Sequence, residues 1–198
     1  MKDYLLGEEL PLEFYERPAE VVAKELLGAI LIHHSNEGRT GGIIVETEAY
    51  LGQDDPACHS ARGPTKRNQS MFGPGGRVYV YRIYGIHWCF NITADEITTP
   101  AAVLIRALEP VVGVSLMQER RKKNNLLELC SGPAKLAVAM GITGEHDGLS
   151  LFSGPIRVYG GIPKGDDEIV STTRIGISKA ADWQLRFYLK NNPYISRK

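Results

Sequence analysis

The sequence predicts a single domain of the mixed α/β (α+β) class over residues 1–198. A length of 198 residues is typical of one domain. The composition, 43% hydrophobic and 23% charged, is that of an ordinary globular protein, which can build a core without disulfides or a metal. Strand-like and helix-like segments are interspersed, and no repeat, low-complexity tract or linker separates them. The composition excludes a disordered chain, a collagen and a disulfide-stapled mini-protein.

Apolar spacing and the positions of glycine and proline define the expected elements. Pro18 precedes apolar residues at helical spacing, so we expect a helix there that ends at Gly28. Further helices are expected over residues 111–122 and 133–140. Residues 52–76 are rich in Gly, Pro, Ser and Asn and predict a long loop, which is typically functional. Strands are expected over residues 29–33, 43–51 (after Gly41-Gly42), 78–84, 87–92, 101–107, 149–152, 156–159 and 185–189.

Charge is balanced in sum but uneven along the chain. Lys plus Arg and Asp plus Glu both number 23, which excludes a generic cationic coat for nucleic acid or membrane. Between Asp55 and Asp95, however, there is no acidic residue. Five bases lie in that stretch, interleaved with Tyr and Gly, and they indicate an anionic partner: Arg62, Lys66, Arg67, Arg77 and Arg82.

Cysteine usage and the first residues bear on the compartment. The cysteines are odd in number and widely spaced, which argues against a disulfide framework or a structural zinc site and fits a reducing compartment: Cys58, Cys89 and Cys130. Residues 1–16 are acidic and lack the apolar region of a signal peptide. No apolar run approaches the roughly 20 residues that span a bilayer. We therefore expect a cytoplasmic protein with no membrane partner.

The segment VETEAY, residues 45–50, is the first candidate for chemistry. Side chains alternate along a strand, so Glu46, Glu48 and Tyr50 share one face. The simplest interpretation is an exposed edge strand. Paired carboxylates are also suited to general acid–base work. A glycoside hydrolase stays open as well, because same-face neighbours lie roughly 6.6–7 Å apart along a strand.

The loop after this strand carries CHS at 58–60 and TKRN at 65–68. Cys58 and His59 lack the spaced partners of a metal site, so a structural or substrate-contacting histidine is the better interpretation. Glycine, hydroxyl, amide and basic side chains together are suited to phosphate contacts. The loop is therefore expected to meet the anionic partner.

Residues 77–91 combine tyrosines, arginines and a glycine pivot. Tyr79 and Tyr81 share a strand face, and Tyr84 lies at the turn before Gly85. Such a ladder is often an ordinary sheet face. Aromatic residues at a tip can also wedge between stacked bases, and recessed ones can sandwich an extruded base.

Six motifs occur together in one order: VETEAY at 45–50, the CHS and TKRN loop, YVYRIYG at 79–85, the cysteine and asparagine at 89 and 91, LIRALEP at 104–110 and LCSGPAKL at 129–136. In this combination the chain resembles the alkyladenine (3-methyladenine) DNA glycosylase family of base-excision repair, over roughly residues 10–190. The resemblance implies a single compact domain with a mainly antiparallel β core and flanking helices. It also implies an enzyme without metal or cofactor that cuts the N-glycosidic bond of a damaged purine.

Roles follow from the resemblance residue by residue. Glu48 matches the glutamate that activates the attacking water, and Arg106 matches an arginine that helps hold this water and the DNA backbone. Glu46 matches an adjacent acid without a clear role. Tyr84 matches the side chain that enters the space vacated by the nucleotide. Asn91 matches an asparagine at the pocket floor that bears on discrimination against normal guanine.

The remaining roles concern stacking and phosphates. The flipped base is expected to stack against three rings: Tyr50, His59 and Tyr81. Arg67 and Arg77 are expected to contact the DNA backbone. Lys135 follows Gly132-Pro133 at a helix start, where phosphate binding is a better fit than the amine nucleophile of a lyase.

The leading hypothesis is a monofunctional DNA-3-methyladenine glycosylase, acting as a monomer on double-stranded DNA. Its substrates are expected to be alkylated purines, with deaminated purines as a further candidate class. The alternative is a non-catalytic module that binds damaged DNA or RNA. A glycoside hydrolase for free sugars ranks third, because it does not explain the acid-free basic stretch.

Overall fold

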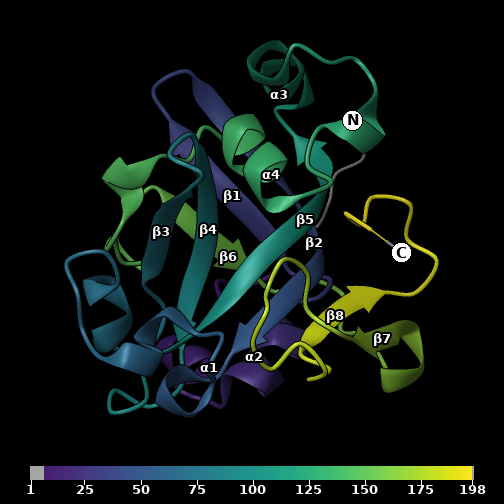
Figure 1. The fold of residues 1–198 in the computed structure, drawn as a ribbon. Coiled ribbons are helices and arrows are strands. Elements are labelled where there is room, and N and C mark those ends of the chain that lie inside the picture. Colours follow the sequence, from purple (N-terminus) through teal and green to yellow (C-terminus); the bar gives the residue numbers. More distant parts are fainter. Residues whose placement is uncertain (1–6, 198) are drawn as a thin grey trace.

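The computed structural model describes residues 7–197, and one antiparallel sheet dominates it (Figure 1). The strand order is β3-β4-β5-β2-β1-β6, with β8 paired to β2 and β7 paired to β8. Every strand pair is antiparallel, which confirms the predicted fold class. The strands are β1 (Ile30–Ser35), β2 (Gly38–Tyr50), β3 (Val78–Ile83), β4 (His87–Ala94), β5 (Ala101–Val112), β6 (Ile156–Tyr159), β7 (Ile169–Thr172) and β8 (Arg186–Leu189).

Strand β2 is the centre of the sheet. It pairs with β5 along nearly its whole length, whereas its other edge pairs first with β1 and then with β8. Gly41 and Gly42 lie inside β2, so the prediction that they precede the strand is wrong. A Cβ on Gly41 would lie 2.6 Å from the Leu31 carbonyl oxygen, and one on Gly42 would lie 2.5 Å from that of Glu109. The two glycines thus permit a close approach of neighbouring strands rather than a turn.

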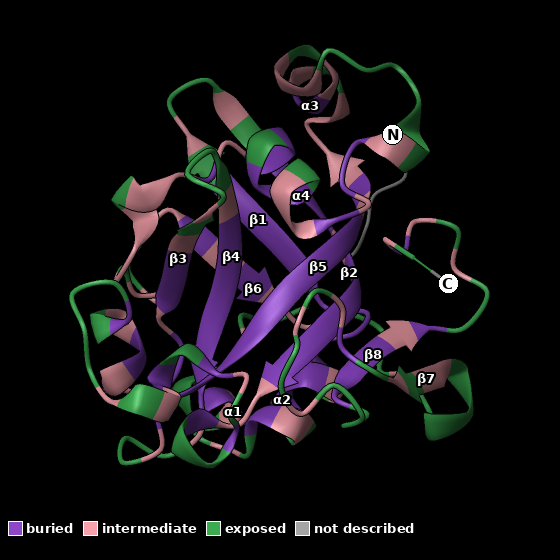
Figure 2. Cartoon of the chain, viewed as in Figure 1, coloured by how far each residue is buried: buried purple, intermediate pink, exposed green. Residues whose placement is uncertain are grey.

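In the described part of the chain, four α-helices flank the sheet: α1 (Leu12–Tyr15), α2 (Ala19–Glu25), α3 (Val114–Arg121) and α4 (Pro133–Met140). Helix α2 packs on β2 and β5, and α4 packs on β4 and β5. Figure 2 shows the buried residues concentrated in the central strands and the exposed ones in the peripheral loops. No helix in the described part of the chain is long and apolar enough to cross a membrane.

A contact with helix α2 identifies the two faces of β2. The Thr47 hydroxyl donates a hydrogen bond to the Ala23 carbonyl oxygen of α2, at 2.8 Å. Since side chains alternate along a strand, Glu46 and Glu48 face away from this helix. They lie instead on the side of the sheet that carries the pocket described below.

Several predicted bounds needed correction. Residues 149–152 form a turn rather than a strand, and only Ser150 makes a bridge, to Arg77. The helix expected over 111–122 begins at Val114, because β5 continues to Val112. The loop at 52–76 contains three short 3-10 helices, and α1 and β7 were not anticipated.

A histidine pair joins β1 to the segment after α4. The Nδ1 atom of His33 lies 2.7 Å from the Met140 carbonyl oxygen and therefore carries a proton. The Nε2 atom of a neutral His33 then accepts from Nε2 of His146, 3.1 Å away. Burial, the largest cause, lowers the pKa of His33, with His146, Arg120 and His34 adding to the effect. A neutral His33 can accept this hydrogen bond.

Candidate active site

A cavity of about 490 Å³ opens beside β2 and is lined by the loop after β2, by β3 to β5 and by residues 175–177. This volume lies in the range of small-molecule sites. Among the residues that the structure describes, no Asp or Glu lines the cavity. The structure brings five of the predicted substrate-binding and catalytic residues to this one cavity: Tyr50, His59, Tyr81, Asn91 and Arg106.

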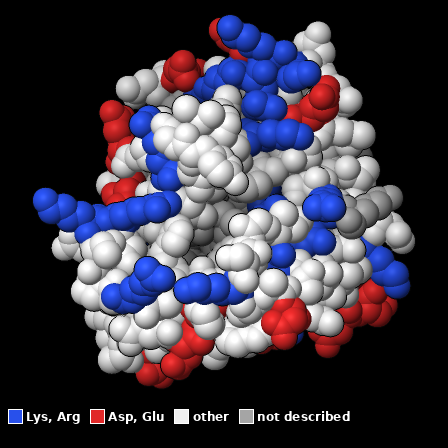
Figure 3. Space-filling model, in the orientation of Figure 1, with Lys and Arg blue, Asp and Glu red and all other residues white. Residues whose placement is uncertain are grey.

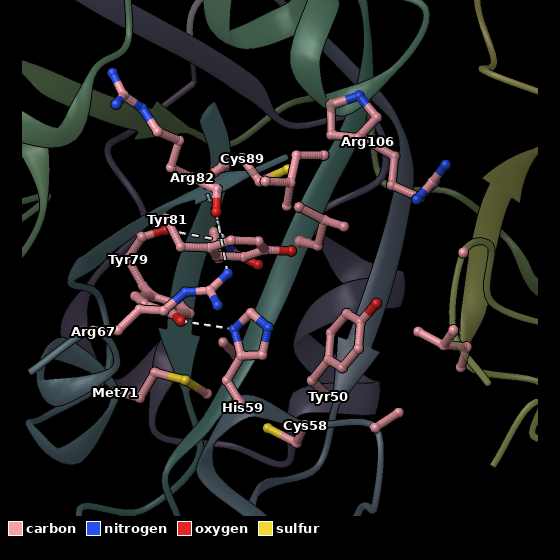
Figure 4. Close-up of a pocket in the computed structure, with 18 of the residues that line it drawn as sticks. Tyr50, Cys58, His59, Arg67, Met71, Tyr79, Tyr81, Arg82, Cys89 and Arg106 are labelled. Atoms are coloured by element: carbon pink, nitrogen blue, oxygen red, sulfur yellow. Dashed lines mark hydrogen bonds between the residues drawn. The ribbon is translucent and has the colours of Figure 1, made fainter. Parts of the chain in front are cut away.

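Aromatic rings form the walls of the cavity (Figure 4). The rings of His59 and Tyr81 meet edge to face, with centroids 4.5 Å apart. Nδ1 of His59 lies 2.8 Å from the Tyr79 hydroxyl, which fixes the orientation of the imidazole. His59 is exposed on its open side, yet the burial of its packed side, followed by the charge of Arg67, lowers its pKa. A neutral, electron-rich ring thus faces the cavity.

Asn91, on β4, is buried and lines the cavity. Its Nδ2 donates to the Tyr79 carbonyl oxygen at 3.0 Å and to that of Cys89 at 3.5 Å. These bonds hold the amide in one orientation.

The Glu48 carboxylate lies directly behind the lining of the cavity and is fully buried. Its Oε2 accepts from the Tyr50 hydroxyl at 2.9 Å, and its Oε1 accepts from the Ile175 backbone N–H at 2.7 Å. Nη1 of Arg106 lies 3.2 Å from the same Oε1. Glu48 does not itself line the cavity, but all three of these partners, Tyr50, Ile175 and Arg106, do. Burial raises the pKa of Glu48, although Arg106, Ile175 and Tyr50 act in the opposite direction.

Glu46 is also fully buried, so the interpretation of this strand face as an exposed edge is wrong. Its Oε1 accepts from Nε of Arg106 at 3.0 Å, from Nη1 of Arg186 at 2.9 Å and from the Ser196 hydroxyl at 2.8 Å. Its Oε2 accepts from the Ser196 backbone N–H at 2.5 Å. These four donors leave Glu46 little capacity to activate a water. It holds Arg106 so that the guanidinium reaches Glu48.

Tyr84 occupies the tip of the hairpin between β3 and β4 and is 90% exposed. Tyr84 and Gly85 both have positive φ, 50° and 70°, the pattern of a type I′ hairpin turn. Ile86 beside it is 69% exposed. The alternative that Tyr84 is an ordinary sheet-face tyrosine is therefore excluded. Because Tyr84 also lines the mouth of the cavity, an apolar tip and a ring cage lie side by side.

Basic side chains surround the cavity, whereas acidic ones lie toward the periphery of the same face (Figure 3). Arg67 lies over the Tyr81 ring, with 5.2 Å from Cζ to the ring centroid. Arg77 lies elsewhere, along a second groove, and its Nη1 donates to the Gly148 carbonyl oxygen at 3.0 Å. Lys135 is exposed in the first turn of α4, next to Pro133 at the cavity.

The cysteines show no sign of a shared site. All three are buried and free. Cys58 contacts Ser60, with 3.1 Å between Sγ and Oγ, while the neighbouring His59 is engaged by Tyr79. Within residues 7–197, no group of three or more His, Cys, Asp or Glu side chains is arranged to hold a metal ion.

Comparison with known families matches residues 13–193 to one described as methylpurine-DNA glycosylase. The chain belongs to this family. Similar chains include one from Methanoculleus marisnigri, 54% identical over 96% of this chain and 99% of the relative, and one from Carboxydothermus hydrogenoformans, 49% identical over 96% and 99%. A third, from Agrobacterium fabrum, is 47% identical over 96% and 93%. All three carry the provisional name 3-methyladenine DNA glycosylase.

Membership of the methylpurine-DNA glycosylase family confirms the resemblance seen in the sequence motifs, and it supports a DNA-repair glycosylase. The cavity, the buried Glu48 and the exposed Tyr84 are compatible with such an enzyme. The individual roles given to the site residues stay predictions.

Two groups of residues at this methylpurine-DNA glycosylase site were missed in the sequence. Tyr79 was assigned only to a strand face, whereas it holds His59. Arg186 and Ser196 bind Glu46, and Ile175 binds Glu48. No sequence signal identifies them, because their partners lie more than a hundred residues away along the chain.

Proposed function

We propose that this protein excises alkylated purines from double-stranded DNA by hydrolysis of the N-glycosidic bond, with Glu48 as the base that activates water. The observation that carries the proposal is a fully buried carboxylate, bridged by Arg106 and Tyr50, directly behind a cavity walled by aromatic rings. A base in a duplex is out of reach of such a group, so it has to be flipped into the cavity.

The ring cage favours an alkylated base. Such a base can carry positive charge, and aromatic faces attract cations. His59 with its lowered pKa is neutral near pH 7 and does not repel a cationic ring. The positive charge also makes the base a better leaving group. Deaminated purines, which lack this charge, would depend on shape and on Asn91.

The chemistry places water between Glu48 and the sugar. The Tyr50 hydroxyl and the Ile175 N–H donate to the carboxylate, and Arg106 forms an ion pair with it. Since a carboxylate has about four acceptor positions, one remains for a water. The water oxygen attacks C1′ while its proton passes to Glu48, and the N-glycosidic bond breaks with its electron pair leaving on the base. Because Glu48 is fully buried in the free protein, a local opening of the cavity lining has to admit the water.

The remaining features serve DNA binding. Arg67, Arg77 and Lys135 would contact phosphates, and these contacts fix register without reading sequence. Tyr84 would fill the gap left by the flipped nucleotide. The proposal includes action as a monomer in the cytoplasm, with no membrane partner.

Base release tests the proposal. Duplexes that each carry one lesion (3-methyladenine, 7-methylguanine, hypoxanthine or ethenoadenine) are incubated with excess protein, and the free base is measured. Glu48→Gln should lower the single-turnover rate about 10²–10⁴-fold while DNA binding persists. Glu109→Gln, on β5, is the matched control. The acid limb of the wild-type rate should lie above pH 4.5, because Glu48 must be deprotonated and its pKa is raised from that value.

Two outcomes would contradict the proposal. Binding of damaged duplexes without release of any base would favour the alternative, a non-catalytic module. Retention of more than a tenth of the wild-type rate in Glu48→Gln would move the chemistry to another residue.

A further inference from the structure

Residues 173–177 run along the cavity without regular secondary structure, yet they contribute to both the wall and the carboxylate site. Ile175, Gly176 and Ile177 line the cavity, and the Ile175 N–H donates to Glu48. Hydrogen bonds of a helix or sheet do not hold this segment in place. Its position depends on side chains, and one buried side chain stands out, that of Arg174.

Arg174 connects three segments of the cavity. Its side chain is fully buried and forms a bidentate ion pair with Asp55, in which Nη2 donates to Oδ1 at 2.9 Å and Nη1 to Oδ2. Nη1 also donates to the Ala49 carbonyl oxygen, at 3.0 Å. Asp55 in turn accepts from the Leu51 and Ala57 backbone N–H groups, at 3.2 and 3.0 Å. The end of β2, the loop that carries His59 and the segment at 173–177 thus share one ion pair.

The guanidinium also supports a wall of the cavity. Its Cζ lies 4.7 Å from the centroid of the Tyr50 ring, on which it stacks. Nε of Arg174 is the buried side-chain nitrogen or oxygen without a hydrogen-bond partner among the described residues. A buried donor without a partner is destabilising, and a buried ion pair is often no better for stability than an apolar pair. The arrangement is thus better explained by geometry than by stability.

We propose that Arg174 and Asp55 are positioning residues for base excision, which lock the Tyr50 ring and the Ile175 N–H onto Glu48. The inference rests on the proposed function. Neither residue lines the cavity, so both act through others. Loss of the lock would leave Tyr50 free to tilt and would withdraw a hydrogen bond from the carboxylate.

This loss has a signature in the pH profile. The Ile175 N–H favours the charged form of Glu48, so its withdrawal would raise the pKa of Glu48 further. The acid limb of the excision rate would move to higher pH. The ionisable groups that act electrostatically on Glu48 or on which it acts are Glu46, Tyr50, Tyr81, Cys89, Arg106 and Arg174.

The test compares Arg174→Lys with Arg157→Lys, a control whose arginine is bound to Glu9 away from the cavity. Single-turnover base release is measured from pH 4.5 to 9, together with affinity for a duplex with an abasic site, which has no base to stack. Arg174→Lys should lower the plateau rate about ten- to hundredfold, since small misplacements cost that much. It should raise the midpoint of the acid limb. Its affinity for the abasic-site duplex should stay within about twofold of the wild-type affinity, a change that is small beside the effect on rate.

A second variant, Asp55→Asn with Arg174→Gln, replaces the ion pair by an amide pair. It allows the test to be made even if Arg174→Lys does not fold. It should show the same upward shift of the acid midpoint. An unchanged rate and midpoint in a folded variant would overturn the inference. The inference would also be overturned if melting temperature, abasic-site affinity and rate all fell while the acid midpoint stayed unchanged. Failure of both variants to fold would overturn it as well. If the wild type releases no base at all, the proposed function itself fails, which is a separate result.

Discussion

Replacement of Tyr84 by Ala separates a DNA-inserting tip from an ordinary surface residue. A buried tyrosine covers about 150–250 Å². With 90% of Tyr84 exposed, only about a tenth of this is buried in the free protein, on the order of 15–25 Å². At about 25 cal/mol per Å² the change would cost about 0.4–0.6 kcal/mol of stability. For a chain of this size that lowers the melting temperature by about 1–2 °C.

The expected effect on activity is larger. Stacking of an aromatic ring on bases contributes about 1–3 kcal/mol. If Tyr84 supplies this in the vacated space, Tyr84→Ala lowers the flipping equilibrium by about 5- to 150-fold. A lesion in a mismatch is already easier to unstack, so the loss should shrink there. The assay is single-turnover base release from matched pairs of duplexes, one with the lesion paired and one with it mismatched.

The control for exposure alone is Ile162→Ala, since Ile162 is 75% exposed and lies in a different pocket. It should leave both rates unchanged. If Tyr84→Ala keeps the paired-to-mismatched ratio of the wild type, Tyr84 does not take part in flipping and the assignment of the tip is wrong. A drop in melting temperature well beyond that of the control would mean that the residue packs against the protein.

Two further predictions concern salt and pH. The logarithm of the affinity for duplex DNA should fall linearly with the logarithm of the salt concentration. If Arg67 and Arg77 each contact one phosphate, replacing either by Gln should flatten the slope by about 0.9. An affinity that does not depend on salt would contradict both predicted contacts. The lowered pKa of His33 means that the unfolded chain, with a value of 6.5, takes up the proton first, so stability is full above that pH and is lost as the pH falls toward the folded value. His33→Gln should therefore flatten the decline in melting temperature below pH 6.5, whereas His87→Gln, at an exposed histidine on β4 that is not among the groups acting on His33, should follow the wild type.

Local sequence patterns predicted much of the candidate site. The alternation in VETEAY placed Glu46 and Glu48 on one face, and the Tyr84-Gly85 pair predicted the exposed turn, because both follow from the geometry of a strand and of a tight hairpin. These are properties of a few adjacent residues, and tertiary contacts did not override them.

Burial of the carboxylates could not be read locally. Glu46 is held by Arg106, Arg186 and Ser196, which are 60, 140 and 150 residues away. An isolated acidic strand face therefore looks exposed in sequence. The same holds for Gly41-Gly42, a pair typical of turns, whose actual use depends on strands that approach from elsewhere in the chain.

The carboxylate site and the hairpin tip differ in local stability, because β2 lies at the centre of the sheet. Glu48 lies on a strand paired on both edges, so its backbone amides exchange with solvent only when most of the sheet opens. Tyr84 lies at the end of a hairpin, where the backbone opens at little expense. Heating should thus abolish the chemistry only at global unfolding, whereas the tip can fluctuate on DNA without disturbing the carboxylate. Hydrogen exchange should therefore be fast at residues 83–87 and slow at residues 45–50.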